Sequence, residues 1–201
     1  MIGLKVIQTL KPPSWQAIVK QLEFGTAVGL TQTAKDGQKA VVDALAGTFT
    51  LRGNWWQQSN KFGIKIKPAT KNDLSSEVRT AADWLELHET GGDKTGRSGG
   101  RITVPTDNVR RNKRMIIPRA QRPQALKGKN SFIATNKRGE TILYRRVGRG
   151  KNQKIVALYI LEKKVRIRKQ STFYAPIEAV VKRNLDRNIR AGIQKALATA
   201  R

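Results

Sequence analysis

The sequence lacks several residue types, and each absence excludes a class of function. None of its 201 residues is cysteine, which excludes disulfide scaffolds, thiol nucleophiles and cysteine-based zinc or iron–sulfur sites. A single histidine, His88, excludes any site that needs two imidazoles. No apolar run approaches the roughly 18 residues that a membrane helix needs. The N-terminus, MIGLKVIQTLKPP, has no secretory h-region, and we expect it to be mature sequence.

Acidic side chains are scarce, and the resulting positive charge is uneven along the chain. The protein has 40 Lys and Arg against 14 Asp and Glu, a net charge of +26. Residues 1–100 carry 13 basic and 9 acidic side chains, a net of +4, whereas residues 101–201 carry 27 and 5, a net of +22. Such an excess favours a polyanion or an acidic protein as partner. Because 38% of residues are hydrophobic, we expect a folded body with a basic face or arm.

The apolar pattern of the first half predicts one helix followed by strands. Residues 14–46 show helical spacing, and we expect one break near Gly25 and Gly29, where small side chains would also allow close packing. Residues 48–108 are predicted to form strands and a Gly-rich loop, with 48–58 paired to 62–69. Within this region, residues 71–90 are compatible with either a strand or a short helix.

The second half predicts an arm, strands and a closing helix. Residues 109–130 mix charge with proline, which indicates an extended basic arm or a long loop. Residues 131–169 are predicted to be antiparallel strands, with a hairpin turning near 137–139. Residues 173–200 have the clearest amphipathic helical pattern. The fold class is therefore α+β: a single domain over 1–201, with terminal helices packed on a mostly antiparallel sheet.

One polar cluster, at residues 83–89, contains groups that could do acid–base or metal chemistry. Glu86 and Glu89 would share a helical face, but no second histidine can complete a metal site. The tryptophan and leucines of the cluster instead favour a packing role. The Gly-rich stretches at 91–100 and 147–154 do not match the phosphate-binding P-loop pattern. We predict no catalytic residue, metal or cofactor, and therefore a protein that is not an enzyme.

Basic residues gather in three clusters, at 110–122, 145–154 and 163–169. Dense like charge is unfavourable unless an anion neutralises it, so the clusters indicate contact with a phosphate backbone or with an acidic protein surface. No motif for base-specific readout is present, and aromatics, at 6%, are too few for a stacking platform. The sequence leaves both partners open. The candidate contact residues are Arg110, Arg111, Lys113, Arg114, Arg119, Arg122, Arg145, Arg146, Arg149, Lys151 and Lys154.

Three segments within residues 60–201 carry a family resemblance. The first is SFIATNKRGETILYRRVGRGKNQKIVALYIL, at 131–161. The second is VRIR followed by the helix FYAPIEAVVKRNLDRNIRAGIQKALATA, and the third is WLELHETGG before a Gly-rich loop. Together they resemble the minor tail protein Z family of lambda-like bacteriophages, relatives of the tail-completion and neck proteins.

The resemblance implies a non-enzymatic structural protein of the phage head–tail junction. It implies a homo-oligomeric ring with six-fold symmetry at the head-proximal end of the tail, which supports head–tail joining close to the DNA end. The implied partners are the tail terminator, tail tube and head-connector proteins, with backbone contact to double-stranded DNA and no membrane. The implied location is the virion, and the host cytoplasm during assembly. The alternative is a cellular basic nucleic-acid-binding protein of the ribosome or nucleoid.

Overall fold

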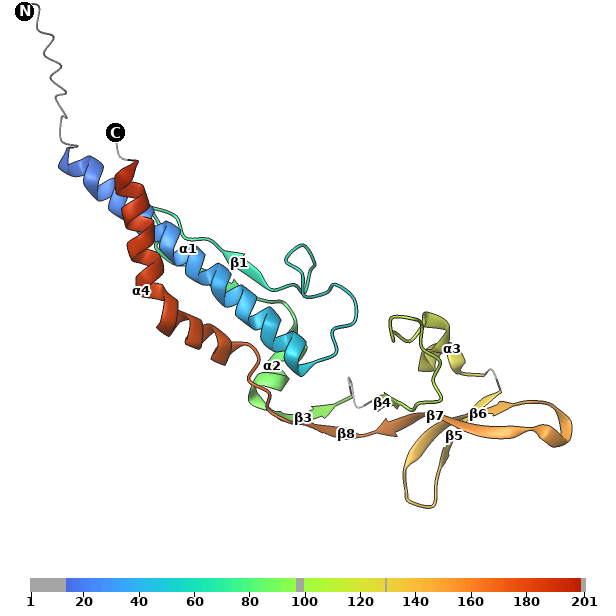
Figure 1. Cartoon of the computed structure of the whole chain (residues 1–201). Helices are drawn as coiled ribbons and strands as arrows, with labels where there is room; N and C mark the ends of the chain where they lie inside the picture. Colours follow the sequence, from blue (N-terminus) through green and yellow to red (C-terminus); the bar gives the residue numbers. More distant parts are fainter. Residues whose placement is uncertain (1–13, 97–99, 129, 200–201) are drawn as a thin grey trace, which may run out of the picture. The chain divides into compact units, whose positions relative to one another are not determined.

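A computed structural model describes residues 14–96, 100–128 and 130–199, and these form two compact units (Figure 1). The helical unit comprises 14–47, 56–81 and 173–199, and the sheet unit comprises the described parts of 48–55 and 82–172. Helices and antiparallel strands are both present, so the predicted α+β class is confirmed. The single domain predicted over 1–201 stays a prediction. The N-terminal stretch expected to be mature sequence lies outside the described residues.

Two long helices dominate the helical unit. α1 spans Trp15–Thr48, and α4 spans Tyr174–Ala198 and crosses α1 (Figure 1). Ser14 acts as the N-cap of α1, because its hydroxyl oxygen accepts a hydrogen bond of 3.2 Å from the Ala17 N–H. The bounds of both helices lie close to those predicted, since a long apolar period is a strong signal.

The predicted break in the first helix is wrong, because α1 is continuous over its 34 residues, Gly25 and Gly29 included. Both glycines face α4 where the two helices cross. A Cβ atom on Gly25 would lie 2.5 Å from the Ile193 Cα, and one on Gly29 would lie 2.5 Å from the Ile189 Cα. Gly192 of α4 meets α1 in the same way. The missing side chains therefore serve the close approach of two backbones.

A short antiparallel ribbon completes the helical unit. β1 (Lys65–Lys67) pairs with β2 (Glu77–Arg79), and Ile66 lies opposite Val78. The predicted pairing of 62–69 with 48–58 is wrong, because 53–63 forms turns and bends, with Gly53 at a φ of 80°. The ambiguous residues 71–90 supply both the strand β2 and the helix α2 (Asp83–Thr90) of the sheet unit.

The sheet unit contains a four-stranded antiparallel sheet in the order β4-β7-β6-β5 (Figure 1). The strands are β4 (Ile102–Pro105), β5 (Ser131–Thr135), β6 (Thr141–Val147) and β7 (Lys154–Glu162). The predicted hairpin is confirmed: β5 and β6 pair across a turn in which the Asn136 side-chain oxygen accepts the N–H groups of Arg138 and Glu140. A 3-10 turn, η3 (Gly150–Asn152), joins β6 to β7.

A second, two-stranded ladder in the sheet unit joins distant segments. β3 (Gly92–Thr95) pairs with β8 (Lys164–Ile167), and Asp93 lies opposite Arg166. Part of the Gly-rich loop predicted at 91–100 is thus a strand, while 97–99 lies outside the described residues. β3 finds its partner because β8 follows β7 after a single residue, Lys163, and extends the chain away from the main sheet.

Residues 106–127 form a loop that folds onto the sheet, and we call it the basic loop. It contains two short helices, η2 (Arg119–Gln121) and α3 (Pro123–Leu126). The predicted alternatives for 109–130 were an extended arm or a long loop, and the described part is a loop. Two of its residues, Val109 and Leu126, are each only 2% exposed, so apolar burial holds the loop in place.

The two buried residues of the basic loop pack on side chains from the sheet, and together they form a small apolar core. An irregularity in β7 determines which residues the sheet contributes to this core. The pairing of β6 with β7 shifts register between Leu143 and Tyr144. A shift of this kind interrupts the alternation of faces along a strand, and the consecutive residues Leu158 and Tyr159 both join the core beneath the basic loop. Their exposures are 6% and 2%. The loop with the first basic cluster is therefore an ordered surface.

Candidate functional site

The predicted contact residues all lie in the sheet unit, in two separate groups. Those of the first cluster lie on the basic loop, and those of the second lie on β6, in the following turn and at the start of β7. Arg111 and Arg145 are half-buried and the others are exposed.

The positive charge of the sheet unit is poorly neutralised by its own acids. Its segments, 48–55 and 82–172, carry 24 basic and 7 acidic side chains, a net charge of +17, against +9 for the rest of the chain. Among the described residues of this unit, Lys164 and Asp93 form the one ion pair, at 2.7 Å. The unit thus leaves most of its cations available to an external anion.

The second cluster does not converge on one point. Arg145 and Arg146 are consecutive on β6 and so point to opposite faces of the sheet. Arg146 lies over the Phe132 ring, 5.3 Å from its centroid, and this ring stacks on Tyr144 at 5.6 Å. The aromatic pair holds the Arg146 guanidinium against the sheet, while the remaining members spread along the exposed turn.

Two of the six predicted residues of the first cluster line a cavity of about 700 Å³, which we call the arginine cavity, and the other four do not. Arg111 and Arg122, eleven positions apart in the sequence, meet there with Arg52 and Arg101, which the sequence analysis did not single out. The rest of the lining is Thr103, Pro105, Met115, Ile116, Ile117, Pro123, Gln124 and Tyr159.

Strand pairing explains how the isolated Arg101 reaches this cavity. β4 pairs with β7 so that Pro105 lies opposite Tyr159. Arg101, Thr103 and Pro105 are at alternate positions and therefore share one side of the strand. The Arg101 guanidinium also donates a hydrogen bond of 3.2 Å to the Leu161 carbonyl, which anchors it beside the sheet. Only the alternation along β4 could have suggested this placement from sequence.

Tyr159 is the buried polar group of the cavity. Its hydroxyl donates a hydrogen bond of 2.8 Å to the Gln121 carbonyl, which ties η2 to β7. Burial raises the pKa of Tyr159 above its ordinary value, and the positive charges of Arg111 and Arg122 act in the opposite direction. The phenol therefore stays protonated at neutral pH, as a structural donor beside two guanidinium groups.

The side chains that line the arginine cavity are suited to binding an anionic ligand. No Asp, Glu or His is among the residues that line it. Four guanidinium groups can hold carboxylate or phosphate oxygens, and an isoleucine, methionine and proline wall can hold an apolar group. The lining offers no acid–base pair and no activated nucleophile for a reaction.

The polar residues at 83–89 belong to a half-buried cluster of aromatic rings. Leu85 is 2% exposed, and the His88 ring packs edge-on against Phe49, at 4.9 Å between centroids, and against Trp84, at 6.0 Å. Burial, with a smaller effect from the charge of Lys94, lowers the pKa of His88. The neutral imidazole thus acts as an aromatic packing group.

The two glutamates of this cluster have different surroundings. Glu86 is exposed, whereas Glu89 is 7% exposed and accepts a hydrogen bond of 3.2 Å from the Thr172 hydroxyl. They do not converge on a shared ligand. Across the part of the chain that the structure describes, no group of three or more His, Asp or Glu side chains could hold a metal ion.

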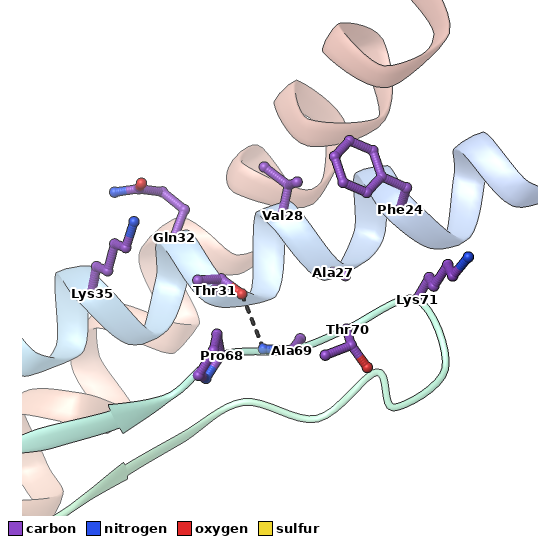
Figure 2. Close-up of a pocket in the computed structure, with 10 residues that line it drawn as sticks. All are labelled: Phe24, Ala27, Val28, Thr31, Gln32, Lys35, Pro68, Ala69, Thr70 and Lys71. Atoms are coloured by element: carbon purple, nitrogen blue, oxygen red, sulfur yellow. Dashed lines mark hydrogen bonds between the residues drawn. The ribbon is translucent and has the colours of Figure 1, made fainter. Parts of the chain in front are cut away.

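The helical unit has a groove of its own, shown in Figure 2. It measures about 450 Å³ and lies between α1 and residues 68–71. Phe24 and Val28 line it and are 51% and 37% exposed. The Thr31 hydroxyl accepts a hydrogen bond of 3.0 Å from the Ala69 N–H, which holds the segment against the helix (Figure 2). The lining of the groove also includes two lysines, but no Asp, Glu or His.

The expected partners have to be corrected. The six-fold ring and the tail terminator, tail tube and head-connector neighbours came from the family resemblance, and the DNA contact came from that resemblance together with the basic clusters. Known proteins supply neither a family nor a relative from which to take these partners. That expectation is wrong as stated, and we withdraw it.

None of the described helices is long and apolar enough to cross a membrane. No protein-family model, curated protein or solved structure matches this chain.

Proposed function

We propose that the protein is a structural, non-catalytic phage virion protein that completes the tail at the head–tail junction, and that its sheet unit is the binding part. The observation that carries the proposal is the form taken by residues 131–161, the segment with the family resemblance. They form three consecutive antiparallel strands, β5, β6 and β7, with the two arginines of YRR on β6 and the GRGK turn between β6 and β7. The resembling segment is thus one folded element.

The charge of the sheet unit and the residues that line its cavity support a binding role over catalysis. The sheet unit carries a net charge of +17 with a single ion pair among its described residues. Its main cavity combines arginines with an apolar wall and lacks acidic lining residues. A catalytic site needs a nucleophile, acid or base held in a defined geometry, and the 83–89 cluster uses its histidine for aromatic packing.

The experiment that tests this function is inactivation of the gene in the phage that carries it. We expect electron micrographs to show filled heads separate from finished tails, and a plasmid copy of the gene to restore joined particles. Antibody labelling of complete particles should mark the head-proximal end of the tail. Joined, infectious particles from the inactivated phage would contradict the proposal.

A second candidate function is a cellular nucleic-acid-binding protein, favoured by the charge excess of the sheet unit. An excess of this size is typical of proteins that contact a phosphate backbone. The neighbouring genes separate the two candidates. Portal and tail genes on both sides would support the virion protein, and translation genes would support the cellular one.

A further inference from the structure

We propose that the arginine cavity binds an acidic peptide segment of a partner protein, with one apolar side chain on the isoleucine and methionine wall and neighbouring carboxylates on the arginines. The binding role of the sheet unit, proposed above, underlies this site. The assignment to a phage does not, because the chemistry of the cavity is the same in a virion or in a cell.

The charge of the arginine cavity favours an acidic ligand. Arg52, Arg101, Arg111 and Arg122 line one cavity, and none of them forms an ion pair with a described acidic residue. Four cations in one cavity repel each other, and an anionic ligand relieves that repulsion. A guanidinium matches a carboxylate through two parallel hydrogen bonds, which gives orientation as well as attraction.

The apolar wall of the cavity favours a ligand that carries an apolar side chain. Pro105, Ile116, Ile117 and Pro123 contribute to it, and Met115 is 52% exposed within it. An exposed methionine beside arginines is typical of adaptable binding surfaces. At about 700 Å³ the cavity is large enough for a side chain with its flanking residues, since ligand pockets measure about 300–1,000 Å³.

Hydrogen bonds within the basic loop fix the conformation of the segment that carries the apolar wall. The Asn112 side-chain oxygen accepts hydrogen bonds from the N–H groups of Arg114, at 3.0 Å, and Ile116, at 2.9 Å. Between them, Met115 has a φ of 58°, a left-handed conformation that is uncommon for a residue with a side chain. The turn is therefore held by Asn112, and the cavity does not have to be ordered by its ligand.

The apolar wall decides between the two classes of polyanion. A duplex presents phosphates on a convex surface and offers no aliphatic or aromatic side chain to cover isoleucine and methionine. An acidic peptide with one large apolar residue satisfies the arginines and the wall together. The cavity thus fits the acidic protein partner that the sequence analysis left open.

Fluorescence anisotropy of a labelled peptide with the full chain tests this site. The probe is a nonapeptide with one central phenylalanine flanked by aspartate and glutamate, and a control peptide carries serine in place of phenylalanine at the same charge. The protein variants are Arg111→Ser/Arg122→Ser, which alters the cavity, and Arg110→Ser/Arg114→Ser. The second pair removes the same charge from the same loop at positions that do not line the cavity.

We expect the cavity pair to weaken binding of the phenylalanine peptide by about tenfold and the control pair by less than about threefold. The serine peptide should bind the unaltered protein about tenfold more weakly than the phenylalanine peptide. Met115→Ser should reproduce the loss seen with the serine peptide. Circular dichroism of each variant shows whether the fold is retained.

Three results would overturn the inference. One is an equal loss of peptide binding in the two arginine pairs, which would indicate a diffuse charge effect. Another is equal affinity for the phenylalanine and serine peptides. The third is tighter binding of a 20-base-pair duplex with the same dependence on Arg111 and Arg122, which would assign the cavity to nucleic acid. Each leaves the head–tail experiment unaffected, so the two proposals fail separately.

Discussion

The helical unit and the sheet unit differ in how their charged residues are paired and in how their elements pack. Most ion pairs of the described chain lie in the helical unit, including Lys39 with Asp43 at 2.8 Å and Lys67 with Asp73 at 3.0 Å. That unit also brings two helix backbones into contact through glycines. The sheet unit keeps its arginines unpaired around a cavity and holds its loop by a small apolar core. The difference indicates that one unit is specialised for rigid packing and the other for binding.

The largest effect on stability is expected at the crossing of α1 and α4. Gly29→Ala would place a Cβ atom 2.5 Å from the Ile189 Cα, against backbone that cannot turn away. We expect a loss of about 3 kcal/mol or more in the free energy of unfolding, measured by urea denaturation of the full chain.

Gly47 offers a matched control for this substitution on the same helix. A Cβ atom on Gly47 would meet nothing within 4 Å. Gly47→Ala should therefore leave stability unchanged or raise it by up to about 1 kcal/mol. Similar effects from the two substitutions would contradict the close crossing.

A somewhat smaller effect is expected in the apolar core of the sheet unit. Leu126→Ala removes a side chain that is 2% exposed and packs beneath the basic loop. We expect a loss of about 2–4 kcal/mol in the free energy of unfolding, together with weaker peptide binding as the loop loosens. Ile133→Ala, at a residue 55% exposed on β5, is the control and should cost less than about 1 kcal/mol. If the two were equal, the loop would not be held by this core.

The polar contacts between α1 and α4 should make the helical unit sensitive to acid. Burial acts to raise the pKa of Asp36, but hydrogen bonds from Asn188, Gln32 and Asn184 outweigh it, so the folded-state pKa lies below its ordinary value. A depressed carboxyl pKa stabilises the fold above the unfolded-state value, about 3.9. That stabilisation is lost as the pH falls from there through the folded-state pKa.

Asn188→Ala tests this contact directly. The Asn188 side-chain amide donates to Asp36 at 3.0 Å and to the Thr33 hydroxyl at 3.1 Å. We expect a loss of about 1–2 kcal/mol at pH 7. As the pH falls below about 3.9, the further loss should be smaller than in the unaltered protein. An unchanged acid profile in unfolding experiments would show that Asp36 is not held by these bonds.

The smallest effect on stability is expected from the cavity arginines themselves. Because they form no ion pairs, Arg111→Ser/Arg122→Ser should change the free energy of unfolding by no more than about 0.5 kcal/mol, with a gain expected at low salt. Denaturation at two salt concentrations measures it. A large loss of stability would mean that these residues support the fold, which would blur the contrast between the two units.

Local signals in the sequence predicted the strongest elements and missed those that depend on distant contacts. The apolar period of α4 and the Asn136–Gly139 turn are local, and the helix and hairpin were predicted close to their observed bounds. Gly25 and Gly29 were expected to interrupt α1, because a glycine pair looks the same in sequence whether it breaks a helix or faces another backbone.

The candidate site could be predicted only in part, because only some of its residues belong to a local sequence pattern. Arg111 and Arg122 belong to a dense basic cluster that composition alone reveals. Arg52 and Arg101 stand apart from other basic residues, and they reach the cavity through a turn and through the pairing of β4 with β7. Such a convergence depends on strand register, which the sequence pattern did not specify.

The most direct measurement of the contrast between the two units is an amide chemical-shift titration of the full, isotopically labelled chain with the phenylalanine-containing acidic peptide. The account predicts saturable shifts at the residues that line the arginine cavity, on β4 and on the basic loop from Arg111 to Gln124, while α1 and α4 remain unperturbed. Shifts centred on the groove of α1, or spread evenly over the basic residues of both units, would contradict it.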